Sequence, residues 1–284
     1  MRFTVWQRLA VWSTSFLVMA TGFLLVFLSG KYVPRMPLIV PSDAKVNTLL
    51  GLSILLGLLS PCVMEYLNTK WRRQIESNIP LFLRDLSEYV RSGATLPRGI
   101  EEVSKRDYGP LTKELKDVVN GIIFGETLDS ALMQMAQRNG LPQVMRMSTI
   151  LVEARRSGGR VIDVLEGSTA LFSDLDNFKR QRYAQMKPYS YLVYMAVGTF
   201  LVVSYVVLTQ FLAPLCAQSS GSTFLQGILD YSYYRSILFW ASVMESIFGG
   251  LLAGKMSEGS LLAGIRHAIL LLSVTLIFFI FLGG

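Results

Sequence analysis

The sequence is poor in the residues that build disulfide frameworks and metal sites. Cysteine occurs only at Cys62 and Cys216, and the single histidine is His267. Two cysteines make no disulfide framework or zinc site, and one histidine cannot assemble a metal cluster by itself. The His-Glu-x-x-His motif of metalloproteases is absent from the sequence. We therefore expect no metal, no cofactor and no catalytic residues, and we do not expect an enzyme.

Charged residues are also few, and they are concentrated in one part of the chain. They make up 17% of the 284 residues, whereas a soluble domain has roughly 25%. Residues 68–188 contain 19 of the 27 basic and 15 of the 20 acidic residues. This segment is as charged as a soluble domain, while the flanking sequences carry almost no charge. The small excess of basic residues in the segment does not indicate a nucleic-acid partner.

The weakly charged parts contain five apolar stretches long enough to cross a membrane, which takes about 20 helical residues. We expect the first to be a retained span, because its apolar run is longer than that of a signal peptide and Trp6 and Trp12 resemble interfacial anchors. The sequence thus predicts an N-terminal membrane hairpin (1–67), a helical domain (68–188) and a C-terminal membrane domain (189–284). The predicted spans are residues 9–28, 48–67, 189–212, 236–254 and 267–284.

Basic residues near the ends of the spans predict the orientation, because such residues are enriched on the cytoplasmic side. We expect a multi-pass protein of the cell membrane, with the N-terminus and residues 68–188 in the cytoplasm and the C-terminus outside. The basic residues that flank the charged segment are Lys70, Arg72 and Arg73 on one side and Lys179, Arg180, Arg182 and Lys187 on the other.

Residues 68–188 follow the 3.6-residue period of amphipathic helices. Apolar positions predict six helices, at 79–90, 96–103, 111–122, 128–135, 144–154 and 161–175. No alternating run rich in β-branched residues is present in this segment, so strands are not expected there. The predicted fold is all-α: a polytopic membrane protein with a cytoplasmic six-helix bundle between spans two and three.

The segment Gly249–Lys255 reads GGLLAGK and matches the first seven positions of a phosphate-binding loop. Met256 occupies the position of the required hydroxyl, and no strand precedes the segment. Gly250 and Gly254 instead form a GxxxG motif, which is typical of close helix packing in membranes. We expect these two glycines at a membrane-helix interface.

Glu245 lies near the middle of the fourth predicted span. An ionised carboxylate there costs about 3 kcal/mol on insertion scales. The residue is expected either to contact a helix of a partner protein or to form a hydrogen bond within its own helix bundle.

Two basic groups in the helical segment are candidate binding residues. The first group is Arg155, Arg156 and Arg160, beside the glycine pair 158–159, and it fits an acidic protein partner or a solvated helix face. The second group is Lys179, Arg180 and Arg182, near the expected membrane surface, and it fits the same partner or anionic lipid.

Three motifs follow one another in the helical segment: GETLDSAL at 125–132, EARRSGG at 153–159 and VIDVL at 161–165. Their order, together with the membrane hairpin, the six helices and the further spans, resembles the GspF/TadC/FlaJ superfamily. These are the platform proteins of type IV pilus, type II secretion and archaellum machines. The resemblance covers residues 75–210 and is closer to the archaeal and Tad-type branch, because the chain has one helical segment where GspF proteins usually have two.

The resemblance implies a mechanical role. In this family a cytoplasmic hexameric ATPase docks on the helical domain, and its motion transfers type IV pilin-like subunits from the membrane into a filament. The resemblance implies that the two basic groups meet the ATPase, and that Glu245 lies where a pilin or a sister platform passes. It also implies a homodimer or a heterodimer with a TadB-like subunit.

The main alternative is a polytopic transporter or channel subunit with a cytoplasmic regulatory domain. Transporters have broken helices in facing repeats and several polar groups at the membrane midplane. The chain has no visible internal repeat and one deep carboxylate, so the platform prediction is favoured. A membrane-anchored signalling protein is a second alternative, but the predicted helices are too short for sustained heptads.

Overall fold

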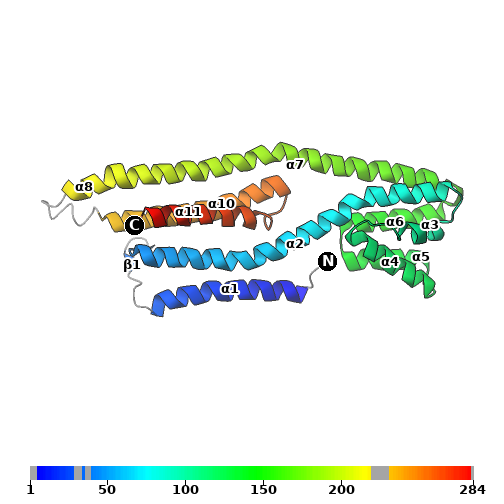
Figure 1. Cartoon of the computed structure of the whole chain (residues 1–284), viewed down its shortest axis with the longest axis horizontal. Coiled ribbons are helices and arrows are strands. Elements are labelled where there is room, and N and C mark those ends of the chain that lie inside the picture. The colour runs from blue at the N-terminus through cyan, green and yellow to red at the C-terminus, as the bar shows by residue number, and fades with distance from the viewer. Residues whose placement is uncertain (1–4, 29–33, 36–39, 219–229, 283–284) are drawn as a thin grey trace. The chain divides into compact units, whose positions relative to one another are not determined.

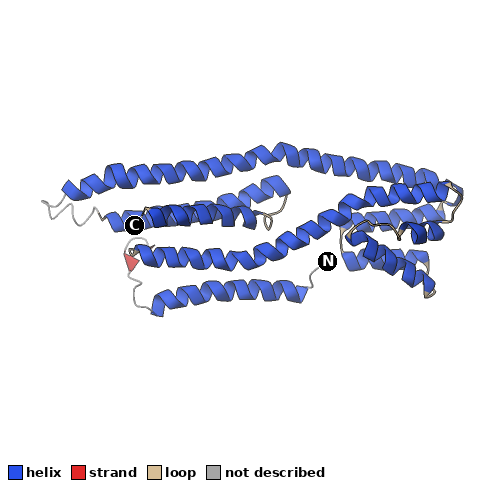
Figure 2. Ribbon diagram, in the orientation of Figure 1, coloured by secondary structure: helices blue, strands red, loops and turns tan. Residues whose placement is uncertain are grey.

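The computed structural model describes residues 5–28, 34–35, 40–218 and 230–282. Nearly all of these residues are helical (Figure 2). The strands in the described part are β1 (Pro34–Arg35) and β2 (Val40–Pro41), which pair antiparallel. Residues 68–188, all of them described, contain no strand. The all-α prediction is therefore confirmed.

Five of the described helices are long and apolar enough to cross a membrane, and each coincides with a predicted span (Figure 1). Residues 283 and 284 of the fifth predicted span lie outside the described part. The helices are α1 (Val5–Leu28), α2 (Ala44–Arg91), the run of α7 (Val161–Val206), the π-helical η2 (Val207–Leu212) and α8 (Ala213–Gln218), then α10 (Tyr231–Glu258) and α11 (Gly264–Phe281).

The chain divides into two compact units. The first unit comprises, among the described residues, 67–182, and the second comprises 5–66 and 183–282. Both α2 and α7 extend from one unit into the other as single helices. The predicted boundaries at 67 and 188 therefore fall inside helices rather than in linkers. A helix satisfies its backbone hydrogen bonds internally and needs no loop where it passes from water into lipid. Pro188 is an exception within α7, because proline has no N–H to donate.

All six helices predicted for the charged segment are present in the first unit. They are the C-terminal part of α2, α3 (Leu96–Val103), α4 (Pro110–Ile123), α5 (Leu128–Asn139), α6 (Pro142–Arg156) and the N-terminal part of α7. Prolines stand in the first turns of α3, α4 and α6, where the missing N–H has no helical partner to lose.

The apolar faces of these six helices pack together in one hydrophobic core. Fully burying an Ile, Leu or Phe side chain stabilises a fold by about 1.5–3 kcal/mol. The long helices contribute buried residues at both ends of the unit's sequence, among them Ile79 and Phe82 from α2 and Leu165 and Phe172 from α7. The core therefore holds α2 and α7 together through the four shorter helices.

A buried carboxylate lies at the edge of this core. Asp85 of α2 accepts a hydrogen bond from the Tyr108 hydroxyl, and Nη1 of Arg106 lies 2.8 Å from the same carboxylate oxygen, Oδ2. The Tyr108 ring is buried and packs edge-on against Phe82. Burial, and then the bond to Asp85, raise the pKa of Tyr108 above its ordinary value, so the hydroxyl keeps its proton. These contacts fix the connection between α3 and α4 to α2.

In the second unit, small residues bring α10 and α11 into close contact. A Cβ atom added at Gly250 would lie 2.2 Å from the Cα of Ala268, and one at Gly254 would lie 2.1 Å from the Cα of Gly264. The hydroxyls of Ser246 and Thr275 share a hydrogen bond of 2.8 Å between the same helices. The GxxxG motif thus packs against α11 of its own chain.

Asn47 joins α2 to α10 within the second unit. Its side-chain amide donates to Ser236 Oγ at 2.8 Å, and its Oδ1 accepts from the Trp240 indole at 2.9 Å. Asn47 is 2% exposed. A buried amide with both ends bonded specifies one register between two helices, since a shifted register leaves polar groups unpaired.

We expect Tyr108→Phe to lower the free energy of unfolding of the first unit by about 1 kcal/mol, because the ring remains but the hydrogen bond is lost. Asp85→Ala should destabilise more, since it leaves the buried hydroxyl without its acceptor. Hydrogen–deuterium exchange of the full chain in detergent, followed over α2 and α3, measures the effect. Arg84→Ala, at an exposed position one residue away, is the matched control, and equal exchange in Arg84→Ala and Asp85→Ala would contradict this account.

Gly250→Ala is expected to destabilise the second unit by roughly 1–3 kcal/mol, because backbone atoms of α11 cannot give way as a flexible side chain can. Gly198→Ala in α7 is the control, since nothing lies within 4 Å of the added methyl group. Thermal unfolding of the detergent-solubilised chain should show a lower Tm for the first variant alone. If both variants melt at the same temperature, the close α10–α11 packing is wrong.

Candidate functional site

The first predicted basic group lies at the junction of α6 and α7. The two helices are joined by the 3₁₀ turn η1 (Gly158–Arg160). Gly158 has a φ of +61°, a conformation that other residues rarely adopt, so the reversal after α6 depends on glycine here. Residues 155–160 are all exposed. The junction therefore presents its basic side chains at the surface of the first unit.

Arg155 already has a partner inside its unit. Its guanidinium pairs with Asp129 of α5 through two contacts, Nε to Oδ1 at 2.8 Å and Nη2 to Oδ2 at 2.5 Å. Hydrogen bonding to Asp129 and the charge of that carboxylate raise the pKa of Arg155 above its ordinary value. A two-point contact of this kind fixes the orientation of both groups. Arg155 therefore joins α5 to α6, and a partner would have to compete with Asp129 for it.

Arg156 and Arg160 are more accessible. Their side chains are 64% and 82% exposed, and the nearest acids are Glu153 at 4.0 Å and Asp163 at 3.8 Å, each three residues away in the sequence. Long, exposed ion pairs contribute little to stability. Both guanidinium groups can therefore exchange these weak contacts for acids of another protein.

The second basic group does not lie at this junction. Lys179 pairs with Glu76 of α2 at 2.7 Å, and Arg180 pairs with Asp176 one turn earlier in α7 at 2.8 Å, while Arg182 is exposed. At 1.5 Å per residue, this group starts roughly 30 Å along α7 from the junction. The six predicted binding residues therefore form two separate patches.

Residues of the three motifs build helix boundaries and contacts between helices. Thr127 caps α5 by accepting a hydrogen bond from the Ser130 N–H at 3.2 Å, and Leu132 and Leu165 are fully buried. The Asp129–Arg155 pair connects the first motif to the second. Sequence analysis missed this pair because its members are 26 residues apart, and only the packing of α5 on α6 brings them together.

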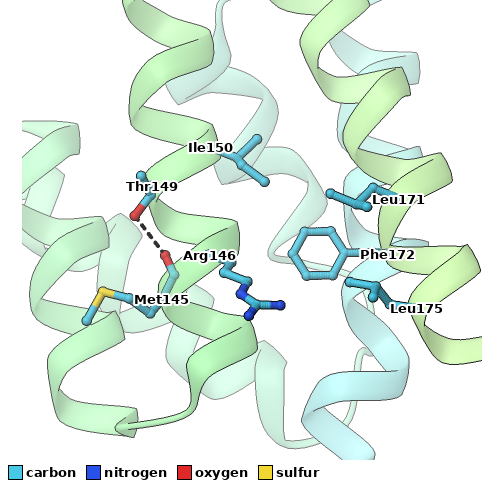
Figure 3. Close-up of a pocket in the computed structure, with 7 residues that line it drawn as sticks. All are labelled: Met145, Arg146, Thr149, Ile150, Leu171, Phe172 and Leu175. Carbon is cyan, nitrogen blue, oxygen red and sulfur yellow. Dashed lines mark hydrogen bonds between the residues drawn. The ribbon is translucent and has the colours of Figure 1, made fainter. Parts of the chain in front are cut away.

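An apolar groove between α6 and α7, which sequence analysis also missed, is visible in Figure 3. Its volume is about 450 Å³. Arg146 extends across it toward Phe172 and Leu175 (Figure 3), and no ion-pair partner of Arg146 is found among the described residues. The lining residues are Met145, Arg146, Thr149 and Ile150 of α6 and Leu171, Phe172 and Leu175 of α7.

Glu245 lies in α10 of the second unit, half-buried. Its Oε2 atom is buried and has no hydrogen-bond partner among the described residues. The neighbouring Ser246 bonds to Thr275 instead. The internal hydrogen bond that was one of the two expectations for Glu245 is thus not formed by this oxygen.

Comparisons with known proteins match most of the first unit and the part of α7 and η2 that follows it. Residues 82–209 match the family model of the type II secretion system (T2SS) protein F. A curated relative, an uncharacterized protein of Methanocaldococcus jannaschii, is 28% identical over 236 residues, which cover 81% of this chain and 38% of the relative. The chain therefore spans about two fifths of the length of the curated relative it matches. No solved structure matches the chain at a significant level.

The matched segment includes the last turns of α2, all of α3 to α6, and α7 into η2. It therefore contains the three motifs, the α6–α7 junction and the apolar groove. Residues 82–209 are therefore similar to type II secretion system protein F, in agreement with the resemblance of the three motifs to the platform proteins of secretion and pilus machines.

Proposed function

We propose that the protein is the platform of a type IV pilus-like or type II secretion machine. In this role it couples a cytoplasmic hexameric ATPase to the insertion of pilin-like subunits into a filament, and it hydrolyses nothing itself. One observation carries the proposal: α2 and α7 run without interruption from the charged unit into the apolar unit. A partner that moves the first unit therefore acts directly on two membrane-spanning helices.

Contacts within the first unit support this coupling. Glu76 of α2 pairs with Lys179 of α7, and Arg91 of α2 pairs with Glu166 of α7. Together with the shared core, these two pairs hold the long helices against each other at positions about 15 residues apart on α2. A push on the α6–α7 junction is thereby transmitted to both helices rather than to α7 alone.

The α6–α7 junction is the surface that we assign to the ATPase. Arg156 and Arg160 are exposed cations in weak local pairs, so acidic side chains of a partner can engage them at little cost to the fold. Arg155 supports the same surface by holding α6 on α5. The patch at Lys179, Arg180 and Arg182 lies further along α7 and suits a second contact with the ATPase or with anionic lipid.

The proposed orientation places the N-terminus and the first unit in the cytoplasm and the C-terminus outside. Basic residues at the ends of the spans support it. In the membrane, the unbonded carboxyl oxygen of Glu245 is the proposed contact for a pilin helix or a second platform subunit. The GxxxG glycines are assigned a different role, because they pack within the chain.

We expect the double variant Arg156→Glu, Arg160→Glu to bind the cognate secretion ATPase about tenfold more weakly, because like charges replace opposite ones at the interface. Pull-down of the ATPase by the full chain in detergent measures this. Arg155 is left unchanged so that the pair with Asp129 survives. The double variant Lys113→Glu, Lys116→Glu, at exposed positions of α4, makes the same change in net charge and controls for it, and undiminished capture by the Arg156, Arg160 variant would refute the assignment of this surface.

Glu245→Gln should reduce filament assembly in cells about fivefold, if one polar contact between membrane helices contributes about 1 kcal/mol. Glu245→Asp keeps the carboxyl group and should retain part of the activity. Counting filaments by electron microscopy at matched protein levels provides the measurement. Normal assembly by the Gln variant would show that Glu245 makes no contact that assembly needs.

A further inference from the structure

Two large apolar side chains project from the end of α4. Ile123 is 72% and Phe124 is 87% exposed. The helix ends at Ile123, and Gly125, two residues later, has a φ of +94°. The Gly125 N–H donates to the Ile122 carbonyl at 3.0 Å, and the Glu126 N–H donates to the Gly121 carbonyl at 2.9 Å. This glycine-dependent end is a well-defined structure. The two side chains are therefore held outward on an ordered turn.

A carboxylate accompanies the apolar pair. Glu126 follows directly after Gly125 and is exposed, and no ion-pair partner of Glu126 is found in the part of the chain that the structure describes. We call Ile123, Phe124 and Glu126 the α4 knob. Contiguous exposed apolar surface that is bordered by polar residues is typical of sites of protein contact, and the α4 knob has this composition on a small scale.

The groove between α6 and α7 has the opposite properties. It is concave and apolar, and its volume of about 450 Å³ is in the range of pockets that hold a ligand group. Phe172 is 2% exposed and lies at its base, while Leu171 is 51% exposed at its edge. Its single charged group is Arg146, which is also without an ion-pair partner in the described structure. An occupant that suits this groove is apolar and carries one negative charge.

We propose that the α4 knob of one copy of this chain binds the α6–α7 groove of a second copy. Phe124 enters the apolar groove, and Glu126 pairs with Arg146. The complementarity of charge and apolar character selects a second copy as the occupant, because the chain itself carries both halves of the contact. A two-fold dimer forms the contact twice.

The inference deepens the proposed function and rests on it, since it takes the first unit as part of a platform with more than one copy. A knob of three side chains buries far less than the roughly 1,600 Å² of a standard stable interface. The contact is therefore weak between free units. Copies that are anchored in one membrane meet at a high effective concentration, which converts a weak contact into a populated one.

The test uses the full chain in liposomes, labelled with donor and acceptor dyes, so that energy transfer reports self-association. We expect Phe124→Ser to weaken association about tenfold or more, as for the central residue of an interface. Arg146→Glu and Glu126→Arg should each weaken it about fivefold, and combining the two substitutions in one chain should restore it. Lys113→Glu, also exposed on α4, should leave energy transfer unchanged.

A second readout does not depend on charge. With Cys62 and Cys216 replaced by Ser, copies that carry Phe124→Cys are mixed with copies that carry Leu171→Cys. On addition of copper phenanthroline as the oxidant, a disulfide between them is expected. Lys113→Cys in place of Phe124→Cys should give no more than background cross-linking. The proposal is overturned if the cross-link does not exceed this background, or if the charge-swapped chain associates no better than the single variants. ATPase capture by the same chains reports the proposed function separately, because Arg156 and Arg160 are intact in all of them.

Discussion

The structure depends on the burial of α2 and α7 in one hydrophobic core. In the first unit, four short helices cover the apolar faces of the two long ones from Ile75 to Leu86 and from Leu165 to Phe172. Because most helical stability in proteins comes from such packing, the short helices act as the support for two long ones. Each long helix then continues into apolar sequence without a break.

Several charged groups in the first unit join helices. Asp129 and Arg155 connect α5 to α6, Glu76 and Lys179 connect α2 to α7, and Asp85 holds the connection between α3 and α4. These contacts add specificity of arrangement more than stability, since partly exposed ion pairs contribute little free energy. Arg156 and Arg160, whose local pairs are long and exposed, are therefore more available to a partner than Arg155.

Packing in the second unit follows the rules of a lipid solvent. There the hydrophobic effect does not distinguish a neighbouring helix from lipid, so close backbone approach and hydrogen bonds bring helices together. Gly250 and Gly254 allow the approach of α11, and Asn47 bonds α2 to α10. Glu245 departs from this pattern, because one of its oxygens is buried without a partner among the described residues.

Amino-acid order alone determined the five candidate spans, the six helices and the resemblance to the platform family, because apolar runs, the 3.6-residue period and short motifs are local signals. It did not reveal that α2 and α7 are continuous, because a change from polar to apolar composition resembles a domain boundary. A helix can continue across such a change, since its backbone hydrogen bonds do not depend on the polarity of its side chains. Tertiary structure decided that Arg155 pairs with Asp129, that the GxxxG motif packs on α11, and that a groove lined by Arg146 lies between α6 and α7. Each of these depends on residues that are distant in the sequence and that meet only when the apolar faces of the helices have been buried together.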